Sequence, residues 1–203
     1  MSGLLKFITC GSVDDGKSTL IGHILYDSKL LYADQEKALE LDSKVGSREG
    51  KIDYSLLLDG LMAEREQGIT IDVAYRYFTT DNRSFIVADT PGHEDFSEDT
   101  YRTLMAADSA VMVIDASKGV EKQTIKLFKV CVMRHIPIFT FINKMDREAK
   151  DPYELMEEIE QELGMDTCPV NWPIGCGKQF KGVYERESKK VIRFVPVQGG
   201  KKE

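Results

Sequence analysis

The sequence predicts an α/β fold in which a mostly parallel β-sheet is covered by helices on both faces. The first observation is a glycine-rich turn, residues 11–18, which separates a short apolar run, residues 4–10, from a helical segment, residues 18–26. The second is the later part of the chain, where apolar runs alternate with helical segments from residue 110 onward. The 203 residues, 42% hydrophobic and 30% charged, suit a single domain with a proper core.

The glycine-rich turn has the G-x-x-x-x-G-K-S spacing of a P-loop, between a strand and a helix. Its glycines allow backbone N–H groups to converge on phosphate oxygens. Lys17 is expected to reach the β and γ phosphates, and the Ser18 hydroxyl to bind magnesium. A simple turn before a helix is the alternative, which the flanking strand and helix disfavour. The candidate nucleotide-binding residues are Gly11, Asp14, Asp15, Gly16, Lys17, Ser18 and Thr19.

A β-hairpin is predicted in the middle of the chain. Residues 71–78 alternate between two faces as a half-buried strand should, and Thr70 lies at the loop-to-strand junction before them. The turn at residues 81–83 then leads into the apolar segment 84–89. We expect the two segments to form an antiparallel hairpin at a sheet edge.

The second strand of this hairpin ends in Asp89-Thr90-Pro91-Gly92, which places an acid where ligands bind in doubly wound sheets. The D-x-x-G motif alone is weak, and its position after a P-loop and at a strand end gives it weight. Asp89 can bind magnesium through water, and the Gly92 N–H can contact a γ-phosphate without a side chain in the way. His93 either orients an attacking water or is an exposed histidine or helix cap. Its order in the chain and its chemistry favour the first.

Strands and helices alternate in the rest of the chain, with apolar runs at residues 110–116 and 136–143 and helical segments at residues 118–134 and 151–163. Such alternation is typical of a parallel sheet covered on both faces.

The strand from residue 136 ends in Asn143-Lys144-Met145-Asp146, and these residues predict which nucleotide base the chain binds. Asp146 as a carboxylate accepts two hydrogen bonds from the ring N–H and amine of guanine, whereas adenine offers a ring acceptor and no amine at that edge. Lys144 can lay its aliphatic stem along the base, and Asn143 can tie this loop to the P-loop. A polar turn after a strand is the alternative.

The formal charge of −7 argues against nucleic-acid binding through bulk electrostatics, although it leaves room for a local basic patch. The N-terminal apolar run is too short to span a membrane and leads directly into the P-loop, so we expect no signal peptide or anchor and a cytoplasmic protein. The cysteines have no C-x-x-C pairing and are expected to be reduced thiols: Cys10, Cys131, Cys168 and Cys176.

These residues together resemble the G domains of translational GTPases, over most of the chain. Residues 1 to about 78 resemble the GTPase subunit of bacterial sulfate adenylyltransferase, through GSVDDGKSTLIG, ILYDSK and DGLMAEREQGITIDVAYRYF. Residues from about 88 to 186 resemble the bacterial peptide-chain release factor GTPase that recycles other release factors from the ribosome. The segments of this chain that carry the second resemblance are ADTPGHEDFSEDTYRTLMAADSAVMVIDASKGVEKQTIKL, PIFTFINKMDREAKDP and NWPIGCGKQFKGVY. On this basis the chain is a hybrid, of natural or laboratory origin, joined near the hairpin.

The resemblance implies a single P-loop G domain over residues 1–203, without the Ser-Ala-Leu-like loop that closes over guanine and without the β-barrel domains that follow it in both relatives. It implies GTP or GDP and Mg²⁺ as cofactors. Thr70 matches the first-switch threonine that binds magnesium with a triphosphate. The implied residues are, for catalysis, His93, Lys17 and Gly92; for the metal, Ser18, Thr70 and Asp89; and for guanine, Asn143, Lys144 and Asp146.

The expected function is GTP hydrolysis by a nucleotide switch, most closely in translation termination. The open alternatives are a GTPase of sulfate activation, a binding module gated by GTP or GDP with negligible hydrolysis, and a fragment without function. The expected partners are a guanine nucleotide and either the ribosome or the catalytic subunit of sulfate adenylyltransferase. No membrane is expected, and no direct nucleic-acid binding by this domain alone.

The tail from residue 182 has two interpretations. It forms a hairpin turned at residues 187–189, which we favour, or residues 191–197 form the last sheet strand. In the second case Gln198-Gly199-Gly200 stands where Ser-Ala-Leu would be.

Overall fold

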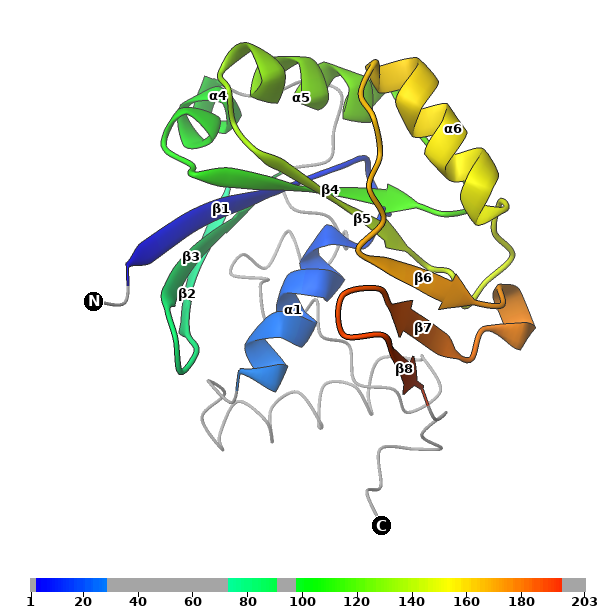
Figure 1. Cartoon of the computed structure of the whole chain (residues 1–203). Coiled ribbons are helices and arrows are strands. Elements are labelled where there is room, and N and C mark those ends of the chain that lie inside the picture. The colour runs from blue at the N-terminus through cyan, green and yellow to red at the C-terminus, as the bar shows by residue number, and fades with distance from the viewer. Residues whose placement is uncertain (1–2, 29–72, 91–97, 195–203) are drawn as a thin grey trace, which may run out of the picture.

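The computed structural model of the chain describes residues 3–28, 73–90 and 98–194 (Figure 1). Three of the predicted site residues, Thr70, Gly92 and His93, lie outside the described residues. The main body consists of β1 (Leu4–Cys10), α1 (Lys17–Asp27), β2 (Ala74–Thr79), β3 (Ser84–Asp89), α4 (Glu98–Met105), β4 (Ser109–Asp115), α5 (Lys122–Met133), β5 (Ile138–Asn143) and α6 (Pro152–Leu163). The elements that follow are β6 (Asn171–Ile174), a short 3₁₀ helix (Gly177–Gln179), β7 (Gly182–Glu185) and β8 (Lys190–Arg193).

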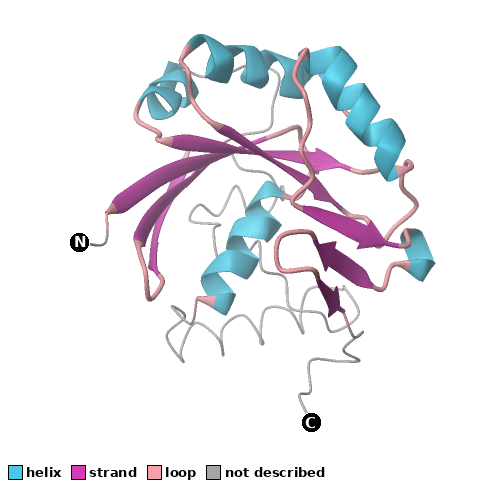
Figure 2. Cartoon of the chain, viewed as in Figure 1, coloured by secondary structure: helices cyan, strands magenta, loops and turns pink. Residues whose placement is uncertain are grey.

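The main sheet has five strands in the order β2-β3-β1-β4-β5. β1 runs parallel to β3 and β4, and β4 runs parallel to β5, whereas β2 is antiparallel to β3 at the edge. Helix α1 covers one face, and α4, α5 and α6 lie on the other (Figure 2). The prediction of a mostly parallel sheet covered on both faces, with a hairpin at its edge, is therefore confirmed.

Neighbouring residues of β1 pack into hydrophobic clusters on opposite faces of the sheet, because successive side chains of a strand point to opposite faces. Phe7 packs with Ile21 of α1 and with Val87. Ile8, the next residue, packs in a larger cluster that includes Leu127 of α5. Burial on both faces explains why the central strands are mostly apolar.

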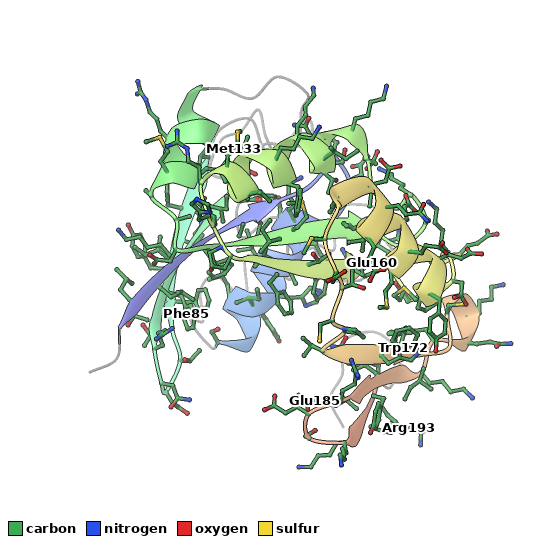
Figure 3. The ribbon with its side chains drawn as sticks, turned by 45° about the horizontal axis from the view of Figure 1, so that its top comes forward. Phe85, Met133, Glu160, Trp172, Glu185 and Arg193 are labelled. Atoms are coloured by element: carbon green, nitrogen blue, oxygen red, sulfur yellow. The ribbon has the colours of Figure 1, made fainter. Side chains whose placement is uncertain are left out.

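The edge strand β2 is buried on one face alone. Phe78 is buried and stacks on Phe85, which Figure 3 labels, with ring centroids 4.7 Å apart. Tyr75 and Tyr77 are exposed. The predicted alternation is confirmed for residues 75–78, whereas residues 71 and 72 lie outside the described residues. The face that carries Phe78 packs into the core.

The helix predicted over residues 118–134 begins later, at Lys122. Residues 115–119 instead form a turn in which the N–H groups of Lys118 and Gly119 donate to the Asp115 carbonyl. Gly119 has φ of 78°, a left-handed conformation that no α-helix tolerates in its interior. By contrast, α6 begins where predicted, because the Asp151 side chain caps it by accepting the Tyr153 N–H at 2.9 Å.

The last strands form a separate antiparallel sheet in the order β6-β7-β8. The hairpin interpretation of the tail is therefore confirmed for the described residues, and the interpretation of residue 191 onward as a strand of the main sheet is wrong. The reason is visible in the register, since Val191 pairs with Tyr184 of β7. None of the described helices has the length and apolar character needed to cross a membrane.

Candidate functional site

The carboxyl ends of β1, β3, β4 and β5 meet along one edge of the sheet. They carry the P-loop, Asp89, Asp115 and the Asn143–Asp146 loop respectively. Parallel strands place their carboxyl ends together, and ligands of doubly wound sheets bind there. Contacts between these segments, described below, bring most of the predicted site residues into one region.

Two glycines of the P-loop leave no room for a side chain. A Cβ added to Gly11 would lie 2.5 Å from the Val113 carbonyl oxygen, and one added to Gly16 would lie 2.5 Å from Nδ2 of Asn143. Gly16 also has φ of 89° and precedes α1 without any side-chain cap. The loop therefore approaches β4 and the β5 loop closely, and it turns the N-terminus of α1 toward the site.

Lys17 is the first residue of α1, and its side chain reaches back to the start of the loop. Its Nζ donates to the carbonyls of Gly11 at 3.0 Å and Ser12 at 2.7 Å, and the residue is only 6% exposed. Burial lowers the pKa of Lys17, and the nearby carboxylates of Asp89 and Asp15 oppose that shift. A desolvated ammonium in such a position binds an anionic ligand more strongly than an exposed one.

Ser18 and Asp89 join α1 to the end of β3. Ser18 Oγ donates to Asp89 Oδ2 at 2.5 Å, and Thr9 Oγ1 donates to Asp89 Oδ1 at 2.9 Å. Asp89 is completely buried, so two neighbouring hydroxyls fix the orientation of its carboxylate. The adjacent oxygens of Ser18 and Asp89 form a donor set that fits Mg²⁺, which prefers oxygen ligands and one or two carboxylates.

Asp15 turns its carboxylate back into the loop. Oδ2 accepts the Ser12 N–H at 2.6 Å, while Oδ1 is buried with no hydrogen-bond partner among the described residues. Burial raises the pKa of Asp15 to about 6, although the Ser12 N–H and the Lys17 charge act in the opposite direction. The Asp15 side chain therefore shapes the loop, and its ionisation lowers the stability of the folded chain because the buried carboxylate is poorly solvated.

This cost predicts a pH-dependent effect of Asp15→Asn in the nucleotide-free chain. Because the folded pKa of about 6 lies above the ordinary 3.8, ionised Asp15 destabilises the folded state, fully above pH 6 and not at all below about pH 4. The variant should have a free energy of unfolding about 2 kcal/mol higher than the parent at pH 8 and nearly equal at pH 4. Urea unfolding at both pH values measures this. Asp14→Asn, at the exposed neighbouring carboxylate, should change little, and an equal difference at both pH values for Asp15→Asn would contradict the account.

Asn143 connects the β5 loop to the P-loop. Its Nδ2 donates to the Asp15 carbonyl at 2.8 Å, and its Oδ1 accepts the Lys144 N–H at 2.9 Å. The predicted tie between the two loops is confirmed. Lys144 adopts φ of 64°, so the backbone turns sharply at this point.

Lys144 makes a second link that the sequence did not predict. Its Nζ forms an ion pair with Asp115 Oδ2 at 2.7 Å and also donates to the Asp14 carbonyl. Burial alone would raise the pKa of Asp115, but hydrogen bonds from Lys144 and Ser117 outweigh it and lower the pKa to about 2. Asp115 ends β4 as Asp89 ends β3, and this shared position was the signal that could have identified it.

Asp115→Asn should therefore destabilise the folded chain at neutral pH. A folded pKa below the ordinary 3.8 gives stability that is present above about pH 4 and lost as the pH falls toward 2. We expect a loss of about 2 kcal/mol at pH 7, and a smaller one at pH 3, in urea unfolding. Asp166→Asn, at an exposed carboxylate, is the control. A loss that is independent of pH would mean that the ion pair is not its cause.

Asp146 and Thr19, two further predicted residues, are exposed. Asp146 lines a cavity of about 440 Å³ together with residues 147–149 and 176–178. The Gly177 N–H donates to the Met145 carbonyl at 2.9 Å, so residues 176–178 form a wall beside the base-reading loop that the sequence did not predict. Thr19 is exposed in the first turn of α1. Of the cysteines, Cys10 and Cys131 are buried, and Cys168 and Cys176 are exposed free thiols.

Comparison with known proteins gives matches over nearly the whole chain. Residues 2–202 match the family described as elongation factor Tu GTP binding domain. Peptide chain release factor 3 of Staphylococcus haemolyticus, Staphylococcus epidermidis and Staphylococcus aureus is 51% identical over 181 residues, which is 89% of this chain. The chain spans one third, 33%, of the length of these relatives. A crystal structure of a Thermus thermophilus protein shares the fold, with a TM-score of 0.76 at 22% identity, over 94% of this chain and 26% of that one.

These matches bear on the predicted hybrid. A match that covers 89% of the chain includes most of residues 1–78 as well as the later part. Similarity to the release factor therefore lies on both sides of the expected junction. The derivation of residues 1–78 from the sulfate enzyme is not tested by these matches and stays a prediction.

Proposed function

The chain belongs to the family of elongation factor Tu GTP binding domains, and from that premise we propose that it binds GTP and hydrolyses it to GDP and phosphate as a nucleotide switch of translation termination. The observation that carries the proposal is the 2.8 Å hydrogen bond from Asn143 Nδ2 to the Asp15 carbonyl. It holds the base-reading loop against the P-loop, so that one ligand carrying both a guanine base and phosphates can engage Asp146 and Lys17 together.

The phosphates bind in the P-loop. Lys17 supplies the positive charge, and the backbone N–H groups at the start of α1 supply hydrogen bonds. When a nucleotide binds, the Lys17 ammonium exchanges its hydrogen bonds to the Gly11 and Ser12 carbonyls for hydrogen bonds to oxygens of the β and γ phosphates. The residues of this part of the site are Gly11, Asp14, Asp15, Gly16, Lys17, Ser18 and Thr19.

The base binds at the β5 loop. Asp146 accepts hydrogen bonds from the ring N–H and the amine of guanine. Lys144 fixes the loop through Asp115 and the Asp14 carbonyl, which keeps its stem stretched across the opening between the two loops.

The reaction is an in-line displacement by water, and the protein contributes positioning and electrostatics more than covalent chemistry. His93 orients the water, the Gly92 N–H contacts the γ-phosphate, and Lys17 stabilises the charge on the phosphates. Ser18, Asp89 and Thr70 would hold Mg²⁺, which when bound neutralises phosphate charge. Turnover by the chain alone is expected to be slow, because no arginine among the described residues can be assigned as a finger.

The wider setting of the reaction is proposed from the relatives. Because they are peptide chain release factors, we propose the ribosome as the partner that accelerates hydrolysis and the cytoplasm as the location. We further propose that residues 1–203 form one G domain.

Single-turnover release of phosphate from bound GTP tests this function, with and without ribosomes. His93→Ala should keep GDP binding within a few-fold and slow phosphate release at least tenfold, since a positioned acid-base or water-orienting group contributes about 10² to 10⁴ in rate. His135→Asn is the control, because this exposed histidine has φ of 55°, which asparagine tolerates. Tight GTP binding with no phosphate release under either condition would indicate a binding module and would overturn the hydrolytic function.

A further inference from the structure

The charge of the chain is distributed unevenly. Residues 171–194, which contain the β6–β8 sheet, hold six Lys or Arg and two Asp or Glu, a net charge of +4. Since the whole chain carries −7, the remaining residues carry −11. The six basic residues are all exposed: Lys178, Lys181, Arg186, Lys189, Lys190 and Arg193. This small sheet is therefore a basic patch on an acidic protein.

One face of the sheet combines aromatic rings with a basic side chain. Trp172, Tyr184 and Val191 lie opposite one another across the three strands, and Arg193 lies on the same face two residues after Val191. Tyr153 of α6 extends the row, with its ring centroid 4.7 Å from that of Trp172. We call these five residues the aromatic face. Tyr184, Val191 and Arg193 are exposed.

The opposite face differs in chemistry. Glu185 and Lys190 pair across β7 and β8 and share that face, so their charges offset each other. Figure 3 shows Glu185 pointing away from the side on which Trp172 and Arg193 lie. The uncompensated positive charge of the strands is thus Arg193, on the aromatic face. At the other end of β8, the turn at residues 186–189 adds two basic residues and one acid, a net charge of +1.

We propose that the aromatic face binds single-stranded RNA. Rings on neighbouring strands of an antiparallel sheet are a platform for unpaired bases, and exposed lysine and arginine contact the phosphates between them. An acidic protein surface would also be attracted by the charges, whereas unpaired bases in addition stack on the row of rings. The choice of RNA over DNA rests on the proposed function, because a translation factor meets RNA, whereas the geometry itself requires no bound GTP.

The charge around the aromatic face determines on which side the RNA backbone lies. Helix α6 carries acids close to Tyr153 in the sequence, Glu154 and Glu157 among them. Phosphates are repelled from that side and attracted toward β8 and the turn at residues 186–189. The backbone of the RNA is therefore expected along β8, with bases directed toward Tyr184 and Trp172.

Fluorescence anisotropy with a labelled 12-nucleotide single-stranded RNA, in the absence of nucleotide, tests the proposal. Tyr184→Val keeps a strand-forming residue and should weaken binding about tenfold without changing its salt dependence, because it removes a stacking ring. Arg193→Gln should weaken binding several-fold at low salt and reduce the slope of log affinity against log salt by about 0.7.

Two variants serve as matched controls. Lys190→Gln removes the same charge from the same strand on the opposite face, and Lys126→Gln removes it from an exposed position on α5. Each should bind RNA within about twofold of the parent. Retained GDP binding and an unchanged thermal unfolding midpoint show that a variant is folded, and they separate this test from that of the proposed function.

Several results would overturn the proposal. They are the absence of RNA binding up to millimolar concentration, equal losses for Arg193→Gln and Lys190→Gln, or no effect of Tyr184→Val. Binding of polyglutamate as tightly as RNA, insensitive to Tyr184→Val, would identify the patch as a site for an acidic protein. Tighter binding of the matching single-stranded DNA would contradict the choice of RNA.

Discussion

Lys17→Ala is expected to abolish nucleotide binding, lowering the affinity for both GDP and GTP at least about a thousandfold, or about 4 kcal/mol. Lys17 is the buried ammonium that already binds two carbonyls of the P-loop, those of Gly11 and Ser12. Without it, clustered phosphate charge would enter a site that also contains the carboxylates of Asp15 and Asp89, with less compensation than in water.

Titration of the variant with GDP and GTP by calorimetry measures this effect. Lys118→Ala is the matched control, because Lys118 contacts the same loop from outside, with Nζ 3.2 Å from the Val13 carbonyl, and is exposed. It should change affinity by a few-fold at most. If Lys17→Ala still bound GTP within a few-fold of the parent, the assignment of the P-loop would be wrong.

Asp146→Asn should exchange the preference for guanine for a preference for xanthine. The variant keeps one acceptor oxygen but presents an amide donor where the carboxylate had its second acceptor. Guanine loses a charge-assisted bond and places its amine against the new amide, whereas xanthine carries a carbonyl at that position. The affinity for GDP should fall at least about a hundredfold, which corresponds to a few kcal/mol.

Competition among GDP, XDP and ADP decides this prediction, and the ratio of affinities is the quantity to compare. Glu148→Gln provides the control, since Glu148 is an exposed acid that lines the same cavity as Asp146. It should leave the preference for GDP unchanged. An unchanged preference in Asp146→Asn would remove the chemical basis for guanine.

The order of strands and helices could be predicted because it depends on short-range patterns. The apolar run before the P-loop became β1, and β3 ends at Asp89 as predicted, while α1 begins at Lys17, one residue earlier than predicted. The start of α5 was misplaced by four residues, because the left-handed conformation of Gly119 outweighs the helical pattern on either side. A single glycine in such a pattern does not reveal its φ angle.

The links within the site could be predicted less well, because they join residues far apart in the sequence. The tie from Asn143 to the P-loop followed from chemistry, but the ion pair of Lys144 with Asp115 did not. It depends on β4 lying beside β5 in the correct register, with Asp115 opposite Asn143. The inward turn of Asp15 likewise depends on the path of the loop, which residue types alone do not determine.

The central claim is that one guanine nucleotide spans the P-loop and the β5 loop. Calorimetric titration of the unmodified chain with GDP and, separately, with ADP tests it most directly. The account predicts one GDP per chain, bound at least about a thousandfold more tightly than ADP, because a site built to pair guanine's donors rejects adenine by about 10⁴ or more. Absence of GDP binding, or equal affinity for the two nucleotides, would contradict it.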